Sequence, residues 1–299
     1  MRRIILSAIL IGPAVLALAQ ITDDIAGYVT LDSVVVLAKQ DGFEQDDFIR
    51  WMEEDTSLYA AFRRLRTMDF VFTVDWDGSY LKGKRPAQYA ARCRQIMDPP
   101  CRKMLIEEES HSGPVYKKDH SVRYYTLATL MDLFYTPTPV CSGGGQPHPN
   151  TGKSTRINQL KEIIFNPGSG QSMPFIGKKF ELFSDRMRTW YQYAWYPQTV
   201  DGEQCFVFAI RLHDKAPKNK AVIQSMVTYF RKGDRQVLYR SYHLKHQGLV
   251  IFETKIQISV RQNDHGQDYP ARINYSGIWN IPGKRGESGQ FQLHIMPAT

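Results

Sequence analysis

Few residues in this sequence have the types and spacing that chemistry requires. The strongest pattern for a nucleophile is GQSMP at residues 170–174, which is close to the G-x-S-x-G elbow that exposes a catalytic serine. Proline stands where the second glycine should be, and it would resist the strained strand-to-helix turn of that elbow. We therefore interpret Ser172 as a loop serine.

Patterns for phosphate and metal binding are incomplete as well. Residues 152–154 read GKS, the end of a phosphate-binding loop, but the earlier glycine of that loop falls at Pro147 and no strand leads into it. His243 and His246 have a spacing that places them on opposite faces of a strand. The sequence thus predicts no catalytic residue, no metal site and no cofactor, and it favours a non-enzyme.

Residues 1–19 have the organisation of a secretory signal peptide. Two arginines precede an apolar run at residues 4–18, and Ala17 and Ala19 form a small-x-small cleavage site. The apolar run is shorter than the ~20 residues that span a bilayer, so we expect cleavage and no transmembrane helix in the mature chain. The sequence therefore predicts an exported protein that is periplasmic, outer-membrane-associated or secreted.

Export makes the cysteines candidates for disulfides, because oxidising compartments preserve them. The four are Cys93, Cys101, Cys141 and Cys205, and their spacing does not fit a zinc site. Three complete pairings are possible. A bridge between Cys93 and Cys101 and a bridge between Cys101 and Cys141 are the two alternatives we favour.

The charge balance is mildly basic. The chain carries 38 Lys plus Arg against 30 Asp plus Glu, for a net charge of +8, and removal of Arg2 and Arg3 leaves +6. The excess is spread along the chain without a base-reading motif, so we expect no nucleic-acid partner. Anionic membrane lipid is a partner that such a surface suits.

Alternation of apolar and polar residues dominates the carboxy-terminal half. Within residues 249–261, the even-numbered positions from Val250 to Val260 are apolar or Thr254, and most odd-numbered positions are polar. This period of two predicts a strand with one buried face. Seven strands of a meander are expected at residues 188–196, 205–212, 222–231, 237–245, 249–261, 271–281 and 290–296.

The amino-terminal half is predicted to mix short helices with strands. Helices are expected at residues 43–52, after Asp55, and at 126–134, 157–165 and 175–183, and strands at 33–38, 70–76, 88–97 and 102–109. Asp77 and Gly78 are a strong hairpin-turn signal after the second of these strands. We therefore predict an α+β fold, a long antiparallel meander sheet forming an open half-barrel with short helices packed on one face. Residues 20–299 are expected to be a single β-rich domain with a Pro/Gly-rich loop at 136–154.

Much of the mature chain resembles uncharacterised secreted proteins of Bacteroidetes-type bacteria. The segments concerned are DTSLYAAFRRLR (55–66), PFIGKKFELFS (174–184), CFVFAI (205–210), TYFRKGDRQVLYRSY (228–242) and INYSGIWNIPGKR (273–285). Their motifs are structural in type, so the resemblance implies no catalytic residue. In architecture, the predicted helices and meander are similar to lipoprotein carrier proteins, whose open half-barrel shelters acyl chains on its concave side.

These observations predict an exported, non-catalytic envelope protein that binds a lipid, a lipoprotein or another apolar ligand. The expected binding residues lie on the apolar sheet face: Phe252, Thr254, Ile256, Tyr275 and Trp279. A structural envelope protein, or one that binds a protein partner, is an alternative. An exported hydrolase whose residues converge from distant segments is a second alternative.

Overall fold

The computed structural model describes residues 44–298 apart from positions 84, 142–176, 218 and 249. Several predictions lie outside the described residues: the signal peptide, the strand at 33–38, the helix at 157–165, and the GKS and GQSMP segments.

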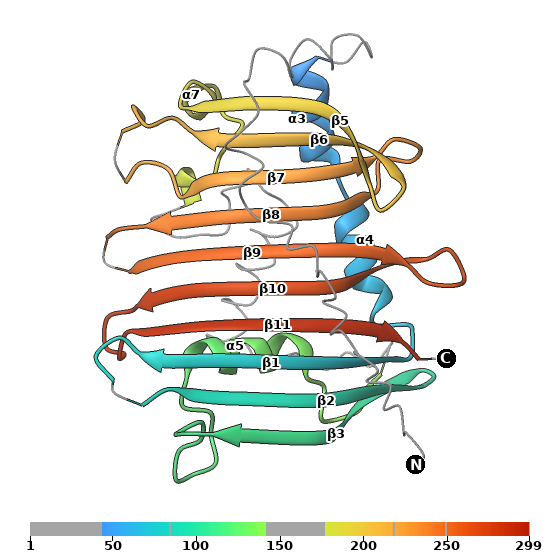
Figure 1. Ribbon diagram of the computed structural model, residues 1–299, viewed down its shortest axis with the longest axis vertical. Coiled ribbons are helices and arrows are strands. Elements are labelled where there is room, and N and C mark those ends of the chain that lie inside the picture. The colour runs from blue at the N-terminus through green and yellow to red at the C-terminus, as the bar shows by residue number, and fades with distance from the viewer. Residues whose placement is uncertain (1–43, 84, 142–176, 218, 249, 299) are drawn as a thin grey trace, which may run out of the picture.

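The described chain forms one open antiparallel sheet of eleven strands (Figure 1). In space the order is β4-β3-β2-β1-β11-β10-β9-β8-β7-β6-β5, so the first hairpins are joined to the meander by pairing of β1 with β11. The strands are β1 Phe70–Tyr80, β2 Ala87–Asp98, β3 Cys101–Ser112, β4 Val140–Cys141, β5 Tyr191–Val200, β6 Glu203–Leu212, β7 Ile223–Arg231, β8 Val237–His246, β9 Ile251–Gln262, β10 Asp268–Asn280 and β11 Glu287–Pro297. All seven predicted strands of the meander are confirmed, with small shifts at their ends.

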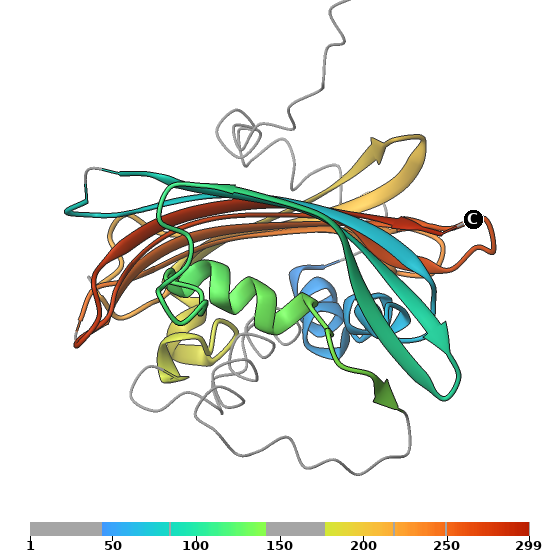
Figure 2. The ribbon, with the colours of Figure 1, turned by 90° about the horizontal axis from the view of Figure 1, so that it is seen from below.

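Short helices lie on the concave face of the curved sheet (Figure 2). They are α3 Gln45–Glu54, α4 Ser57–Arg64 and α5 Tyr125–Phe134, with two single turns, η1 Gly177–Lys179 and α7 Asp185–Arg188. None of these described helices is long and apolar enough to cross a membrane. The prediction of a long, open antiparallel sheet with short helices on one face is confirmed, although the described structure is largely sheet.

The burial of β9 follows the predicted alternation. Phe252, Ile256 and Val260 are buried, whereas Lys255 and Arg261 are exposed. The two histidines of β8 likewise lie on opposite faces of the sheet. His243 lies on the outer face beside Glu253, and His246 is buried on the inner face beside Phe252.

The helix α3 fills one half of the concave face. Its apolar spacing buries Phe48, Ile49, Trp51 and Met52, and Phe48 stacks on Phe208 of β6 with ring centroids 5.5 Å apart. Phe48 also contacts Trp195 of β5, and the aromatic residues Tyr191, Tyr193 and Trp195 of that strand are all buried in the core. This half of the sheet is therefore closed by side chains of the protein itself.

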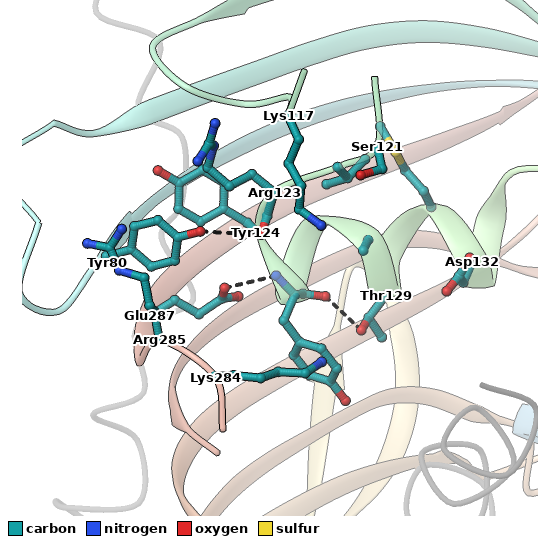
Figure 3. Close-up of a pocket in the computed structure, with 14 residues that line it drawn as sticks. Tyr80, Lys117, Ser121, Arg123, Tyr124, Thr129, Asp132, Lys284, Arg285 and Glu287 are labelled. Carbon is teal, nitrogen blue, oxygen red and sulfur yellow. Dashed lines mark hydrogen bonds between the residues drawn. The ribbon is translucent and has the colours of Figure 1, made fainter. Parts of the chain in front are cut away.

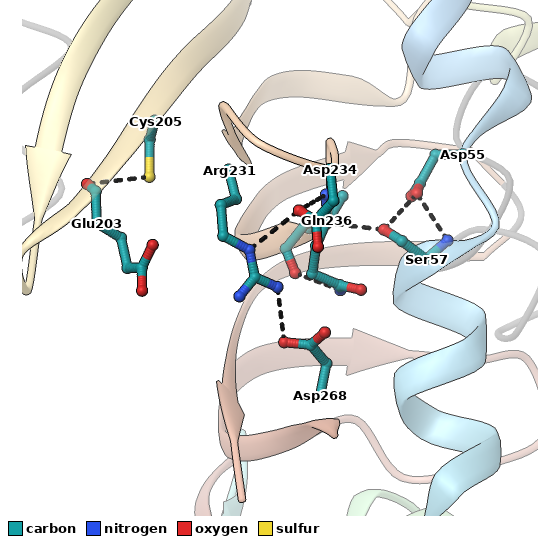
Figure 4. A network of polar contacts seen from close by, with 9 residues as sticks. Asp55, Ser57, Glu203, Cys205, Arg231, Asp234, Gln236 and Asp268 are labelled. Atoms are coloured by element: carbon teal, nitrogen blue, oxygen red, sulfur yellow. Dashed lines mark hydrogen bonds and ion pairs between the residues drawn. The ribbon is translucent and has the colours of Figure 1, made fainter. Parts of the chain in front are cut away.

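Polar contacts fasten the start of α4 to the β7–β8 hairpin (Figure 4). The hydroxyl of Ser57 accepts a hydrogen bond from the backbone N–H of Val237 at 2.9 Å and donates one to Asp55 at 2.6 Å. Arg231, at the end of β7, binds Asp268 of β10 at 2.9 Å and Asp234 at 3.0 Å. The first helices are thus fixed by specific hydrogen bonds as well as by apolar packing.

A disulfide joins Cys101 to Cys141 and ties β4 to the edge of the sheet. One of the two favoured pairings is therefore confirmed, and the pairing of Cys93 with Cys101 is wrong, because Cys93 is a buried free thiol on the inner face of β2. Cys205 is also a buried free thiol. A disulfide is typical of an oxidising compartment and therefore agrees with the predicted export.

The hairpin turn predicted at Asp77 and Gly78 is wrong. Strand β1 continues to Tyr80, and Gly78 pairs with Gly289 of β11 and with Ala87 of β2. The indole of Trp76 lies over Gly78 so closely that a Cβ atom there would clash with the ring. The glycine serves close packing inside the sheet, which the Asp-Gly dipeptide does not distinguish from a turn.

The helix predicted at residues 175–183 is also wrong for its described part. Only the single turn η1 forms, and Phe180 and Leu182 are buried outside a helix. The backbone N–H of Val222, just before β7, donates to the carbonyl of Lys179 at 3.1 Å, so this segment bonds to the meander as well as to its own backbone. In the loop predicted at 136–154, the described part contains the two-residue strand β4.

Candidate ligand-binding site

The five residues predicted to bind a ligand lie together on the concave face of β9 and β10. In the register of the two strands, Ile256 pairs with Tyr275, Thr254 with Gly277, and Phe252 with Trp279. The ring of Phe252 stacks on Trp279 at 4.9 Å, and Tyr275 stacks on Phe291 of β11 at 5.0 Å. We call Phe252, Trp279, Tyr275 and Phe291 the aromatic wall.

A glycine makes room for the centre of this wall. Gly277 lies between Tyr275 and Trp279, and a Cβ atom there would clash with the Tyr275 hydroxyl and with the methyl group of Thr254. The Tyr275 hydroxyl accepts a hydrogen bond from the indole Nε1 of Trp279. Burial raises the pKa of Tyr275, and the Trp279 hydrogen bond offsets part of that shift, so the phenol stays neutral.

Helix α5 is held over β1 and β11 by a buried carboxylate. Glu287 is 3% exposed, and its two oxygens accept hydrogen bonds from the backbone N–H groups of Tyr125 at 2.8 Å and Thr126 at 2.6 Å. A negative charge at this end of a helix is stabilising because the first N–H groups have no partner within the helix. The hydroxyl of Thr126 also accepts from Nε1 of Trp76 at 3.3 Å, which fixes the helix to the sheet below.

A pocket of about 630 Å³ opens beside the start of α5 (Figure 3). Four segments surround it: the end of β1, the loop between β3 and α5, the outer side of α5, and the hairpin between β10 and β11. Its lining residues are Tyr80, Lys117, Ser121, Val122, Arg123, Tyr124, Tyr125, Ala128, Thr129, Met131, Asp132, Lys284, Arg285 and Glu287. None of these residues was predicted from the sequence to bind a ligand.

Tyr125 connects the pocket with the aromatic wall. Its ring lines the pocket and meets Trp279 edge to face, with ring centroids 5.9 Å apart. Lys284 lies over the same ring at 4.6 Å from its centroid. One tyrosine thus separates an apolar surface on the sheet from a cationic surface at the pocket rim.

Catalytic geometry is not apparent in the described ranges. No group of three or more His, Cys, Asp or Glu residues there could hold a metal ion. His243 Nε2 lies 2.9 Å from Glu253 Oε1, but Lys245 binds the same carboxylate at 2.8 Å. Hydrogen bonds from Lys245 and then His243 lower the pKa of Glu253, which suits an ion-pair cluster on the outer face of the sheet.

Comparison with known proteins identifies no family. No protein-family model matches the chain and no curated protein matches it, so the resemblance to secreted Bacteroidetes-type proteins stays a prediction. Among solved structures, a putative outer membrane lipoprotein-sorting protein domain from Vibrio parahaemolyticus is similar, with 10% identity, a TM-score of 0.26, and coverage of 90% of this chain and 94% of that one. Lipovitellin, solved with a view to its lipid–protein interactions, has 6% identity, a TM-score of 0.26, and coverage of 78% of this chain and 25% of its own.

A TM-score of 0.26 does not define a common fold, so the likeness to these two structures carries no function over to this chain. The proposed function therefore rests on the geometry of the site.

Proposed function

We propose that this protein is an exported, non-catalytic envelope protein that binds a lipid or another apolar ligand in the pocket beside α5, next to the concave face of the sheet. The observation that carries the proposal is the pocket of about 630 Å³ whose lining residue Tyr125 contacts the aromatic wall. Ligand sites in proteins span roughly 300–1,000 Å³ and are lined mainly by apolar and aromatic side chains. The pocket therefore has a suitable size, and its lining residue Tyr125 joins it to the aromatic wall.

The predicted binding residues have two different roles in this proposal. Tyr275 and Trp279 are partly exposed and can contact a ligand directly. Phe252, Thr254 and Ile256 are 6%, 3% and 8% exposed, so they pack beside Tyr275 and Trp279 and are largely covered. The half of the concave face under α3 is filled by packed aromatic side chains. We therefore place the ligand at the half that α5 covers.

The test is uptake of a fluorescent fatty acid by the purified mature protein. The variant Ala128→Phe places a large side chain on the pocket surface of α5, and we expect it to weaken uptake about tenfold or more by filling the pocket. The matched control is Leu133→Phe, on the same helix but outside the pocket lining, which should bind as the unmodified protein does. A well-folded protein that takes up no fatty acid would overturn the proposal.

A protein that binds a protein partner is the second candidate, and the edge strand β3 favours it. Only Cys101 and Arg102 of β3 pair with β4, so among the described residues the outer edge of positions 103–112 has no neighbouring strand. Leu105 and Ile106 on this strand are 39% and 46% exposed. An open edge of this kind can receive a strand from another chain. A photo-crosslinking residue at position 105 in the exported protein should then give a discrete adduct, and one at the exposed Met296 should not.

A further inference from the structure

Four cationic side chains line the pocket beside α5, and they come from two separate segments. Lys117 and Arg123 belong to the loop before α5, and Lys284 and Arg285 belong to the hairpin between β10 and β11. Figure 3 shows Lys117 reaching toward the helix from one side, with Lys284 and Arg285 on the other. The acidic lining residues are Asp132 and Glu287, so the lining carries a net charge of +2.

The start of α5 is not itself the source of this positive character. Glu287 accepts both of the first N–H groups and so neutralises the helix terminus. The positive charge of the pocket therefore comes from the four cationic side chains around the helix terminus.

Two of these cations, Arg123 and Arg285, are positioned without being neutralised. Arg285 lies over the ring of Tyr80 at 4.1 Å from its centroid, and Arg123 donates to the backbone carbonyl of Tyr116 at 3.3 Å. Among the described residues, no carboxylate forms an ion pair with Lys117, Arg123 or Arg285. A ring and a carbonyl hold the two guanidinium groups in place while their full charge stays available to a ligand.

Two buried polar atoms of the lining have no hydrogen-bond partner in the described part of the chain. They are the hydroxyl of Tyr124, whose side chain is 1% exposed, and Nε of Arg123. Both atoms can donate, and buried donors are almost always satisfied. A carboxylate or phosphate group supplies acceptor oxygens without adding donors, and it binds cationic donors more strongly than a neutral group does.

The apolar and cationic surfaces meet at Tyr125, which touches Trp279 on one side and Lys284 on the other. We propose that the pocket recognises an anionic head group, a carboxylate or a phosphate, on an amphiphile whose acyl chain runs along the aromatic wall. This inference rests on the proposed function and assigns the head-group chemistry of its ligand. A preference for an anionic head group distinguishes this site from a general apolar groove, which would bind neutral amphiphiles as tightly as anionic ones.

The experiment compares three probes with the full mature protein below their critical micelle concentrations: dodecyl phosphate, dodecanol and inorganic phosphate. Calorimetry at low salt should show dodecyl phosphate binding about tenfold or more tightly than dodecanol, with the preference falling as salt is added. The double variant Lys117→Gln/Arg285→Gln should lose most of this preference and still bind dodecanol. The control Lys118→Gln/Lys220→Gln removes two exposed charges that lie outside the pocket lining, and it should keep the preference.

The outcomes separate this inference from the proposed function. Equal affinity of the unmodified protein for dodecyl phosphate and dodecanol would overturn the anionic head group and leave apolar binding in place. Inorganic phosphate that binds as tightly as dodecyl phosphate would indicate a free-anion site and overturn the amphiphile. An unchanged preference in Lys117→Gln/Arg285→Gln would overturn the assignment to these side chains. Binding of none of the probes would overturn the proposed function together with the inference.

Discussion

The guanidinium of Arg240 lies 3.0 Å from the carboxylate of Asp55, and both side chains are buried where β8 meets the turn between α3 and α4. Nε of Arg240 donates to the hydroxyl of Thr228 at 3.1 Å, and Asp55 also accepts from the backbone N–H of Ser57 at 2.8 Å. Charges in an interior are tolerated when they are paired and hydrogen-bonded in this way. The pair therefore links the first helices to the centre of the sheet.

Removing one member of this pair should be strongly destabilising. The change Asp55→Ala leaves Arg240 charged and buried, and we expect the free energy of unfolding to fall by about 3–5 kcal/mol. The control Arg261→Gln removes the charge from the exposed pair with Asp201 and should cost under about 1 kcal/mol. Chemical denaturation measures both values, and similar losses for the two variants would contradict the structural role of the Arg240 pair.

Gly78 should tolerate no side chain. In Gly78→Ala the new methyl group meets the ring of Trp76, which is 1% exposed and is bonded to Thr126, so it cannot move away easily. Overpacking of this kind costs about 1–3 kcal/mol, and thermal unfolding will measure it. Gly233→Ala is the control, since a Cβ atom there has no neighbour within 4 Å, and its melting temperature should stay near that of the unmodified protein.

The buried tyrosines predict a loss of stability in alkali. Burial raises the pKa of Tyr193 and of Tyr242 to about 12, and Arg240 opposes the shift at Tyr242. The folded state thus favours the neutral phenol, so this contribution is fully present below the unfolded pKa of about 10 and is lost as the pH rises through about 12. Unfolding experiments between those values should show stability falling with pH. Phenolate absorbance should rise later in the folded protein than in denatured chains, and identical titrations would contradict the burial.

The disulfide should leave two thiols for labelling. Alkylation under denaturing, non-reducing conditions is expected to modify Cys93 and Cys205, and reduction should expose Cys101 and Cys141. In the native protein Cys93 should react slowly at pH 8, because burial raises the pKa of its thiol to about 11. Reduction should lower the free energy of unfolding by about 3–4 kcal/mol, given a loop that spans 40 residues. Four labelled thiols before reduction would rule out the bridge.

The sequence predicted those features that depend on neighbouring residues. The alternation around Phe252 and Ile256 placed the buried face of β9 correctly, because side chains in a strand point to opposite faces in turn. The turn expected at Gly78 failed because a glycine needed for close packing has the same local signature as one needed for a turn.

The pocket could not be predicted in the same way. Glu287 bonds to Tyr125 across 162 positions of the sequence, and no local pattern links a hairpin carboxylate to a distant helix terminus. Lys284 and Arg285 stood out in the sequence only as the end of the segment at 273–285. Their meeting with Lys117 depends on the pairing of β1 with β11, which alternation alone does not specify.

That pairing also has a consequence for how the chain is made. Strand β1 is synthesised early, but one of its two neighbours is β11, so residues 70–80 keep an open edge until residues 287–297 have emerged. Contacts between residues that are far apart in the sequence form slowly, and an exposed strand edge can aggregate with other chains until those contacts form. Export of the kind we propose, if it began before β11 is synthesised, would therefore act on an incompletely folded chain, and the sheet would be completed only after translocation.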